Sequence, residues 1–169
     1  MGNNLLLLAK MEDGNFEVSK APFDISDTID KDIASMEAAA AGKGLSLSKS
    51  IEQGIVIDSD QETVRQVFAI LLENAIKYCD ENGQIAVSLA KSGHSVICSV
   101  KNSGRGIAKK DLPRIFDRFY RADKSRSGEN GGFGLGLSIA KTMTHRLGGN
   151  ITVESTENKW TVFTFTLLP

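Results

Sequence analysis

Four short segments of the chain contain side chains of the kind that bind a phosphorylated ligand. The first lies at residues 72–78, where Asn74 and Lys77 are three positions apart and share one face of a predicted helix. The amide oxygen of Asn74 can ligate a hard cation such as Mg²⁺, and the ammonium group of Lys77 can neutralise a phosphate. Asparagine and lysine on a helix are more often solvated surface residues, so this pair alone does not identify a site.

Two further segments are rich in glycine. Residues 102–107 (Asn-Ser-Gly-Arg-Gly-Ile) follow a predicted strand, and their two glycines allow the backbone to approach a ligand closely. Residues 131–137 (Gly-Gly-Phe-Gly-Leu-Gly-Leu) open a predicted helix, whose free N–H groups and positive dipole favour an anion. Each segment also has a plainer interpretation, the first as a turn and the second as a tightly packed helix start.

The fourth segment combines aromatic and basic residues at 115–123. Its two phenylalanines and its tyrosine can anchor a loop, while Arg118 or Arg121 can reach a phosphate. Residues 105–126 hold eight basic side chains against three acidic ones. The segment is therefore either a solvated basic face around a small satellite core or a lid over an anionic ligand.

The periodicity of apolar residues predicts the elements that must position these segments. The strongest signal is a helix over 61–79, and a third helix is predicted over 135–147. A helix capped by Ser26 or Asp27 is predicted to run to about residue 41 and to be closed by Gly42. Strands are predicted at 22–25, 45–48, 55–57, 84–89, 95–100, 151–153 and 160–168, the fourth and fifth forming a hairpin. This order predicts an α+β fold, a two-layer sandwich with three main helices against one face of a mixed sheet of about five strands.

The composition excludes several classes of protein. A chain of 169 residues, 41% of them hydrophobic, is long enough for one globular domain with a real core. Its net charge of −1 argues against nucleic acid as the main partner. No segment approaches the ~20 consecutive apolar residues that a membrane-spanning helix needs. Cys79 and Cys98 have no metal-ligand spacing, so we interpret both as reduced packing residues.

Taken together and in this order, the four segments resemble the ATP-binding catalytic domain of sensor histidine kinases. That family belongs to the superfamily shared by gyrase, Hsp90 and MutL. Residues 74–78 match its N box, 102–107 its G1 box, 116–121 its F box and 132–137 its G2 box. The resemblance covers residues 5–168 and implies the Bergerat (GHKL) ATP-binding fold with a long ATP lid.

The resemblance also implies a reaction and a set of binding residues. The domain would bind ATP with Mg²⁺ and transfer the γ-phosphoryl group to a histidine. Asn74 would bind the magnesium ion, and Lys77 and Tyr78 would line the phosphate and ribose side. The adenine pocket, the lid and the phosphate cradle would comprise Asn102, Gly104, Gly106, Ile107, Phe116, Phe119, Tyr120, Arg121, Gly132, Gly134, Leu135, Gly136 and Leu137.

Two positions depart from the family pattern. The G1 box usually opens with aspartate, whereas Asn102 accepts the adenine amino hydrogen without a charge, which removes about 1 kcal/mol of affinity. The G2 box often has serine or threonine where Phe133 stands, so a hydroxyl contact to phosphate is absent. We therefore expect ATP binding to be weakened but not abolished.

A third position distinguishes two classes of enzyme. In the ATPase branch of the superfamily, a glutamate four residues before the magnesium asparagine activates water, and here that position is Ile70. Glu73 lies at the wrong angle, since each residue turns the helix by about 100°. We expect a site that holds ATP without a general base for water. A GHKL ATPase or serine kinase, and a nucleotide-binding module without kinase activity, are the alternatives.

The histidine that accepts the phosphoryl group is expected to lie outside this sequence. His94 falls in a predicted hairpin turn and His145 on the last helix, and we interpret both as surface residues. Residues 1–14 look like the remnant of an upstream dimerisation helix and its linker, and residues 15–169 like the catalytic domain.

The resemblance implies two partners, namely the dimerisation domain that carries the histidine and a response regulator receiver domain, and no nucleic acid. We expect the isolated domain to be a cytoplasmic monomer that cannot phosphorylate itself. Its parent is expected to be a homodimer anchored in the membrane.

Overall fold

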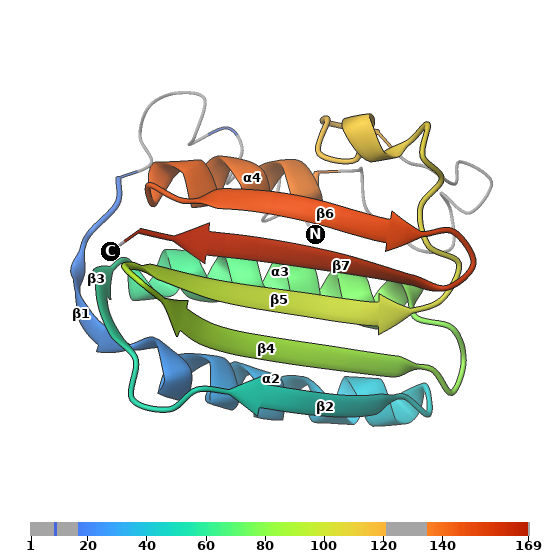
Figure 1. The fold of residues 1–169 in the computed structure, drawn as a ribbon, viewed down its shortest axis with the longest axis horizontal. Coiled ribbons are helices and arrows are strands. Elements are labelled where there is room, and N and C mark those ends of the chain that lie inside the picture. The colour runs from blue at the N-terminus through green and yellow to red at the C-terminus, as the bar shows by residue number, and fades with distance from the viewer. Residues whose placement is uncertain (1–8, 10–16, 121–134, 169) are drawn as a thin grey trace.

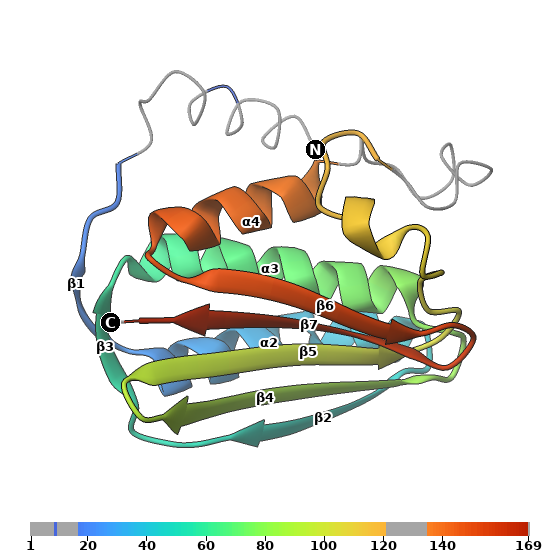
Figure 2. The ribbon, with the colours of Figure 1, turned by 45° about the horizontal axis from the view of Figure 1, so that its top comes forward.

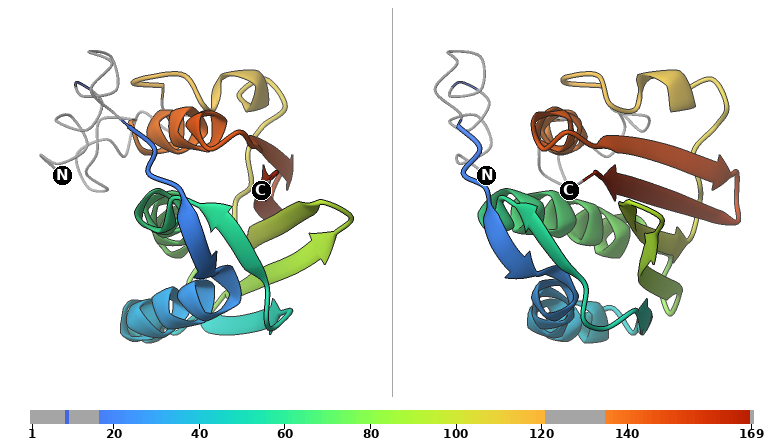
Figure 3. Two further views of the ribbon diagram at one scale, coloured as in Figure 1. Left: turned by 90° about the vertical axis from the view of Figure 1, so that its left-hand side faces the viewer. Right: turned by 60° about the vertical axis from the view of Figure 1, so that its left-hand side comes forward.

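The computed structural model describes residues 17–120 and 135–168, together with Ala9. The described elements form two layers, a five-stranded sheet and three helices that cover one of its faces (Figures 1 and 3). The strand order is β2-β4-β5-β7-β6, in which β2 pairs in parallel with β4 and the other neighbours are antiparallel. The bounds of these strands are Ser46–Ile51 for β2, Gln84–Ser92 for β4, Ser95–Ser103 for β5, Asn150–Thr156 for β6 and Trp160–Leu167 for β7. The predicted α+β sandwich with a mixed sheet is confirmed.

The helices are α2 (Ile25–Gly42), α3 (Gln61–Tyr78) and α4 (Gly136–Arg146). Aspartates cap the first two, because a carboxylate can accept from the free N–H groups of the first turn. Asp24 accepts from the N–H of Asp27 at 2.9 Å, and Asp60 accepts from the N–H of Thr63 at 3.0 Å.

The prediction that Ser26 or Asp27 caps α2 is wrong. Ser26 is fully buried in the first turn, where its hydroxyl donates to the carbonyl of Glu52 at 2.6 Å and accepts from the N–H of Ile55 at 3.1 Å. It therefore ties the start of α2 to the connection that follows β2, at residues 52–55. The far end also differs, since Gly42 is still helical and the left-handed turn comes at Gly44, with φ of +70°.

The hydrophobic core lies between the helices and the sheet. Inward residues alternate along the strands, as expected for a sheet with one covered face. They meet buried side chains of α3 and α4. The largest fully buried side chains are Phe68, Phe165, Ile25, Ile29, Ile33, Leu71, Leu72, Ile85, Leu89, Ile139, Met143 and Leu167.

A second, two-stranded sheet lies beside the main one. It pairs β1 (Ala21–Asp24) antiparallel with β3 (Val56–Ser59), so the predicted strand at 55–57 does not join the five-stranded sheet. This small sheet connects the ends of α2 and α3 that lie farthest from the end of β5 and the start of α4 (Figure 1).

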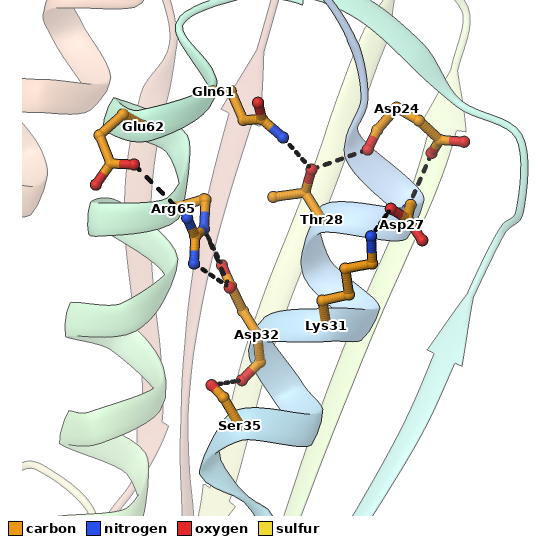
Figure 4. A network of polar contacts seen from close by, with 9 residues as sticks. All are labelled: Asp24, Asp27, Thr28, Lys31, Asp32, Ser35, Gln61, Glu62 and Arg65. Atoms are coloured by element: carbon orange, nitrogen blue, oxygen red, sulfur yellow. Dashed lines mark hydrogen bonds and ion pairs between the residues drawn. The ribbon is translucent and has the colours of Figure 1, made fainter.

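Polar contacts fix α2 against α3 on the outside of the helix layer (Figure 4). Arg65 of α3 contacts Asp32 of α2 at 3.1 Å and Glu62 at 3.6 Å. Gln61 donates to the hydroxyl of Thr28 at 3.1 Å, and that hydroxyl donates to the carbonyl of Asp24. Because the ion pairs are half exposed, they set the alignment of the two helices more than they stabilise the fold.

Predictions for the two cysteines and the two histidines are confirmed. Cys79 and Cys98 are buried free thiols, and burial raises the pKa of Cys98 far above its ordinary value. His94 and His145 are exposed. Within residues 17–120 and 135–168, no helix has the length and apolar character needed to cross a membrane.

The two capping aspartates give a matched test of this fold. Asp60 is 9% exposed, and its second carboxylate oxygen also accepts from the N–H of Ser19 at 2.9 Å, whereas Asp24 is exposed. We expect Asp60→Ala to lower the free energy of unfolding by about 2 kcal/mol and Asp24→Ala by about 1 kcal/mol or less. Urea titrations of the two variants measure the difference. Equal losses would show that the contact of Asp60 with Ser19 adds nothing.

Candidate functional site

The C-terminal half of α3 presents the first group of predicted residues. Asn74 and Lys77 are half-buried, and Tyr78 at the end of the helix is 46% exposed. The ammonium group of Lys77 lies 5.4 Å from the centroid of the Tyr78 ring. Ile70, one turn earlier, is also partly buried and packs against the core. These side chains therefore lie on α3 where the helix surface passes from the hydrophobic core to solvent.

The end of α3 is joined directly to the end of β5. Cys79 and Gly104 form an isolated antiparallel bridge between the two segments. A Cβ at Gly104 would lie 2.8 Å from the carbonyl oxygen of Tyr78, and its φ of +146° is also unfavourable for other residues. Glycine is thus required at this position because two backbones meet there. The predicted N and G1 segments, about thirty residues apart in the sequence, are brought into contact.

Asn102 lies on the inner, helix-facing side of β5 and is 4% exposed. Its side-chain amide donates to the carbonyl of Ser103 at 2.9 Å. Asn102 is therefore a buried polar side chain at the rim of the apolar core, of the kind that orients a small ligand in a largely apolar pocket.

The glycine-rich segment after β5 packs on the β6–β7 hairpin. The N–H of Gly104 donates to the carbonyl of Lys159 at 3.2 Å, and the N–H of Ile107 donates to the hydroxyl of Ser155 at 2.8 Å. A Cβ at Gly106 would lie 2.5 Å from the carbonyl oxygen of Thr156. Both glycines therefore allow the backbone of this segment to lie close to the backbone of the β6–β7 hairpin.

Residues 108–120 lead from the glycines after β5 toward the part of the chain before α4. A short 3₁₀ helix, η1 (Leu112–Arg114), lies within a run of turns. The ring of Phe116 packs edge-on against Phe163 of β7, with centroids 6.0 Å apart, and the ammonium group of Lys141 from α4 lies 5.3 Å from its centroid. Phe116 thus anchors the segment to the sheet and to α4, the role that the resemblance implies for both Phe116 and Phe119.

The other aromatic residues of this segment behave differently. Phe119 is 62% exposed and has a left-handed backbone, with φ of +62°, so it does not seat the segment on the core. The Tyr120 hydroxyl donates to the carboxylate of Asp111, and the guanidinium of Arg114 lies 4.5 Å from the centroid of the Tyr120 ring. In this conformation Tyr120 contacts its own segment.

The start of α4 completes the arrangement. Its N-cap residue is Leu135, whose apolar side chain makes no capping hydrogen bond. A Cβ at Gly136 would meet Cγ2 of Ile70 at 3.5 Å, so the helix begins beside α3. Figure 2 shows the C-terminal end of α3, the start of α4, the end of β5 and residues 104–120 at the same end of the molecule. Leu137 is half-buried, whereas Arg121, Gly132, Phe133 and Gly134 lie outside the described residues.

Sequence reasoning missed the polar residues that join these segments. Ser103 and Asp80 link β5 to the end of α3, Ser155 holds the backbone of Ile107, and Asp111 accepts from Tyr120. Their short polar side chains are typical of turns, so the sequence contained no periodic signal for them. The one available hint was the position of Ser103 between Asn102 and Gly104.

Comparisons with known proteins agree with this geometry. The family described as "Histidine kinase-, DNA gyrase B-, and HSP90-like ATPase" matches residues 59–169. Sensor histidine kinase WalK of Bacillus subtilis is 35% identical over 167 residues, which cover 98% of this chain and 27% of WalK. Sensor protein CiaH of Streptococcus pneumoniae is 36% identical over 161 residues, which cover 95% of this chain and 36% of CiaH. The chain therefore belongs to the histidine kinase-, DNA gyrase B- and HSP90-like ATPase family.

Solved structures place the chain with histidine kinases. Full-length ShkA in complex with AMPPNP superposes with a TM-score of 0.85 and 28% identity, over 98% of this chain and 34% of that chain. A nucleotide-free catalytic domain of the histidine kinase ThkA superposes with a TM-score of 0.78 and 26% identity, over 89% of this chain and 95% of that chain. The match to ThkA covers a catalytic domain almost entirely, whereas this chain spans only about a third of full-length ShkA.

The Tyr120–Asp111 contact predicts a measurable titration. The hydrogen bond to Asp111 is the main cause that raises the pKa of Tyr120 above its ordinary value. The stability that this hydrogen bond contributes is therefore fully present below the ordinary pKa of tyrosine and is lost as pH rises through the raised pKa of Tyr120. We expect Asp111→Ala to lower the pKa of Tyr120. Tyrosinate absorbance measures this in a Tyr78→Phe background, where Tyr120 is the only tyrosine.

Asp117→Ala serves as the control for that titration. Asp117 acts on Tyr120 only through its charge and is the weakest of the causes, so its removal should shift the pKa less. A Tyr120 pKa that is the same in native protein and in Asp111→Ala would contradict the contact.

Proposed function

We propose that this chain is the ATP-binding catalytic domain of a two-component sensor histidine kinase. It binds Mg-ATP and transfers the γ-phosphoryl group to a histidine on a dimerisation domain. The observation that carries this proposal is the meeting of three motif segments at one end of the sandwich. There, the C-terminal half of α3 meets both Gly104 after β5 and Gly136 at the uncapped start of α4.

The residues at this end fit the parts of Mg-ATP. Asn102 provides a buried amide for the adenine amino group, with Gly104, Gly106 and Ile107 forming the rest of that pocket. The free N–H groups at the start of α4, in Gly136 and Leu137, suit the phosphates. The remaining ligand contacts are assigned to Lys77, Tyr78, Phe116, Phe119, Tyr120, Arg121, Gly132, Gly134 and Leu135.

The metal assignment follows from the donors that are present. Among the described residues, no group of three or more histidine, cysteine or acidic side chains could hold a metal ion. We assign Mg²⁺ to the amide oxygen of Asn74, and phosphate oxygens and water would complete the coordination, which is usual for Mg²⁺ in nucleotide sites.

Catalysis would rest on positioning and charge neutralisation, because phosphoryl transfer needs little covalent chemistry from the protein. The side chain one turn before Asn74 is Ile70, which packs beside Gly136 and cannot accept a proton from water. This favours transfer to an external histidine over hydrolysis. It also weighs against the alternative of an ATPase. The labelling experiment below distinguishes a kinase domain from a nucleotide-binding module without kinase activity.

The parent protein is inferred from the same resemblance. WalK and CiaH are sensor proteins much longer than this chain. We infer that the domain lies on the cytoplasmic side of a membrane-anchored homodimer, and that the phosphorylated histidine passes its phosphoryl group to a response regulator. We infer that the isolated domain is a monomer and that neither His94 nor His145, both exposed, is the acceptor, so the domain should not label itself.

Mixing the chain with a separately purified histidine-bearing dimerisation domain and γ-labelled ATP tests this function. We expect acid-labile, base-stable label on the dimerisation domain, none on this chain, and little release of free phosphate without the partner. ATP binding without transfer would support the non-catalytic module, and rapid phosphate release by the chain alone would support an ATPase.

The Asn102→Asp substitution tests the adenine pocket. A carboxylate accepts the adenine amino hydrogen more strongly than an amide, so we expect ATP to bind about fivefold more tightly. The free protein should meanwhile lose stability, because the aspartate cannot donate to the Ser103 carbonyl and its charge is buried. Calorimetric titration and thermal unfolding measure the two effects. Unchanged affinity for ATP would contradict the assigned role of Asn102.

A further inference from the structure

We propose that Ser103 and Asp80 are positioning residues for the nucleotide site, an inference that rests on the proposed function. They form one hydrogen-bonded unit that sets the register between the end of α3 and the end of β5. Neither side chain is assigned a contact with the nucleotide. Their effect would pass through Asn102 on β5 and through the last turn of α3.

Hydrogen bonds join Ser103 and Asp80 to each other and to the turn that follows α3. The Ser103 hydroxyl donates to the Asp80 carboxylate at 2.7 Å and accepts from the N–H of Gln84 at 2.8 Å. The N–H of Asp80 donates to the Ser103 carbonyl at 3.4 Å, and the N–H of Gly83 donates to the Asp80 carbonyl at 2.9 Å. Ser103 and Asp80 are therefore hydrogen-bonded to each other both through their side chains and through their backbones.

The same atoms orient the predicted adenine acceptor. The Ser103 carbonyl that accepts from Asp80 also accepts from the side-chain amide of Asn102 at 2.9 Å. On the other side, Asp80 follows Cys79, which is bridged to Gly104, and Tyr78 lies one residue further back. Loss of the Ser103–Asp80 bond would loosen the seam on which Asn102 and Tyr78 are both held.

The side chains of Ser103 and Asp80 add to the backbone bridge between Cys79 and Gly104 at this seam. Ser103 is half-buried and Asp80 is exposed, so these two side chains hold the rim of the site through polar contacts more than through apolar packing. The bond is charge-assisted, since a hydroxyl donates to a carboxylate, and such bonds are stronger than neutral ones. A misplacement of well under 1 Å at a binding group is enough to weaken a ligand contact.

Calorimetric titration of ATP with Mg²⁺ into single and double variants tests the inference. We expect Ser103→Ala and Asp80→Ala each to weaken ATP binding about fivefold, and the double variant to bind no more weakly than either one, since both remove the same bond. Asp80→Asn keeps an oxygen that accepts from Ser103 and should lose less affinity than Asp80→Ala. Because Asp80 is exposed, its variants should keep the fold intact.

Ser88→Ala is the matched control. Ser88 on β4 shares a hydroxyl–hydroxyl hydrogen bond of 2.5 Å with Ser99 on β5, in the same sheet but facing away from the helices. It should lose comparable stability, measured by urea unfolding, without a change in ATP affinity.

The outcomes are distinct. If Ser103→Ala and Asp80→Ala bind ATP with native affinity, the positioning role is overturned while the proposed function stands. The same conclusion follows if the losses of affinity add up in the double variant, or if Ser88→Ala weakens ATP binding as much as these two substitutions do. Failure of the native chain itself to bind ATP would overturn the proposed function and this inference with it.

Discussion

The site depends on one close approach, between the backbone of Gly104 after β5 and the backbone at the end of α3. No side chain larger than hydrogen fits there, because a Cβ would lie 2.8 Å from the carbonyl oxygen of Tyr78. This approach allows the Cys79–Gly104 bridge, which joins the end of α3 in the helix layer to the end of β5 in the sheet. Asn74 and Asn102 lie on the two elements that meet there, so the proposed ATP site depends on this contact to bring the N and G1 segments to one ligand.

Two kinds of segment surround that contact, namely elements that are part of the hydrophobic core and a loop that is attached to it more loosely. Asn74, Asn102 and Gly136 belong to elements that carry the hydrophobic core, and binding groups on such elements are held more precisely than groups on loops. Residues 108–120 are attached mainly through Phe116, while Phe119 is exposed and Tyr120 contacts Asp111. A loop with a single aromatic anchor suits a lid, because its remaining contacts can change without disturbing the core.

The sequence predicted the long elements well and the connections poorly. The helix at Gln61–Tyr78 and the β4–β5 hairpin follow from apolar periodicity, which burial on one face imposes. The cap of α2 was misplaced because Ser26 and Asp24 are equally good caps by type, and only the buried bonds of Ser26 to Glu52 and Ile55 exclude it. Likewise, the motifs identified Asn102 and Gly104, but Asp80 and Ser155 matter through contacts between distant segments that local patterns do not encode.

Paramagnetic broadening by Mn²⁺-ATP, observed in amide NMR spectra of the chain, tests most directly whether this end of the sandwich is the nucleotide site. Broadening should be strongest at residues 74–78, 102–107 and 136–137. The β4–β5 turn at Gly93 and the loop at Gly54 lie at the opposite end and should stay sharp (Figure 1). Selective broadening at Gly93 or Gly54, or no broadening at residues 74–78 and 102–107, would contradict the assignment of the ATP site to the junction of α3 and β5.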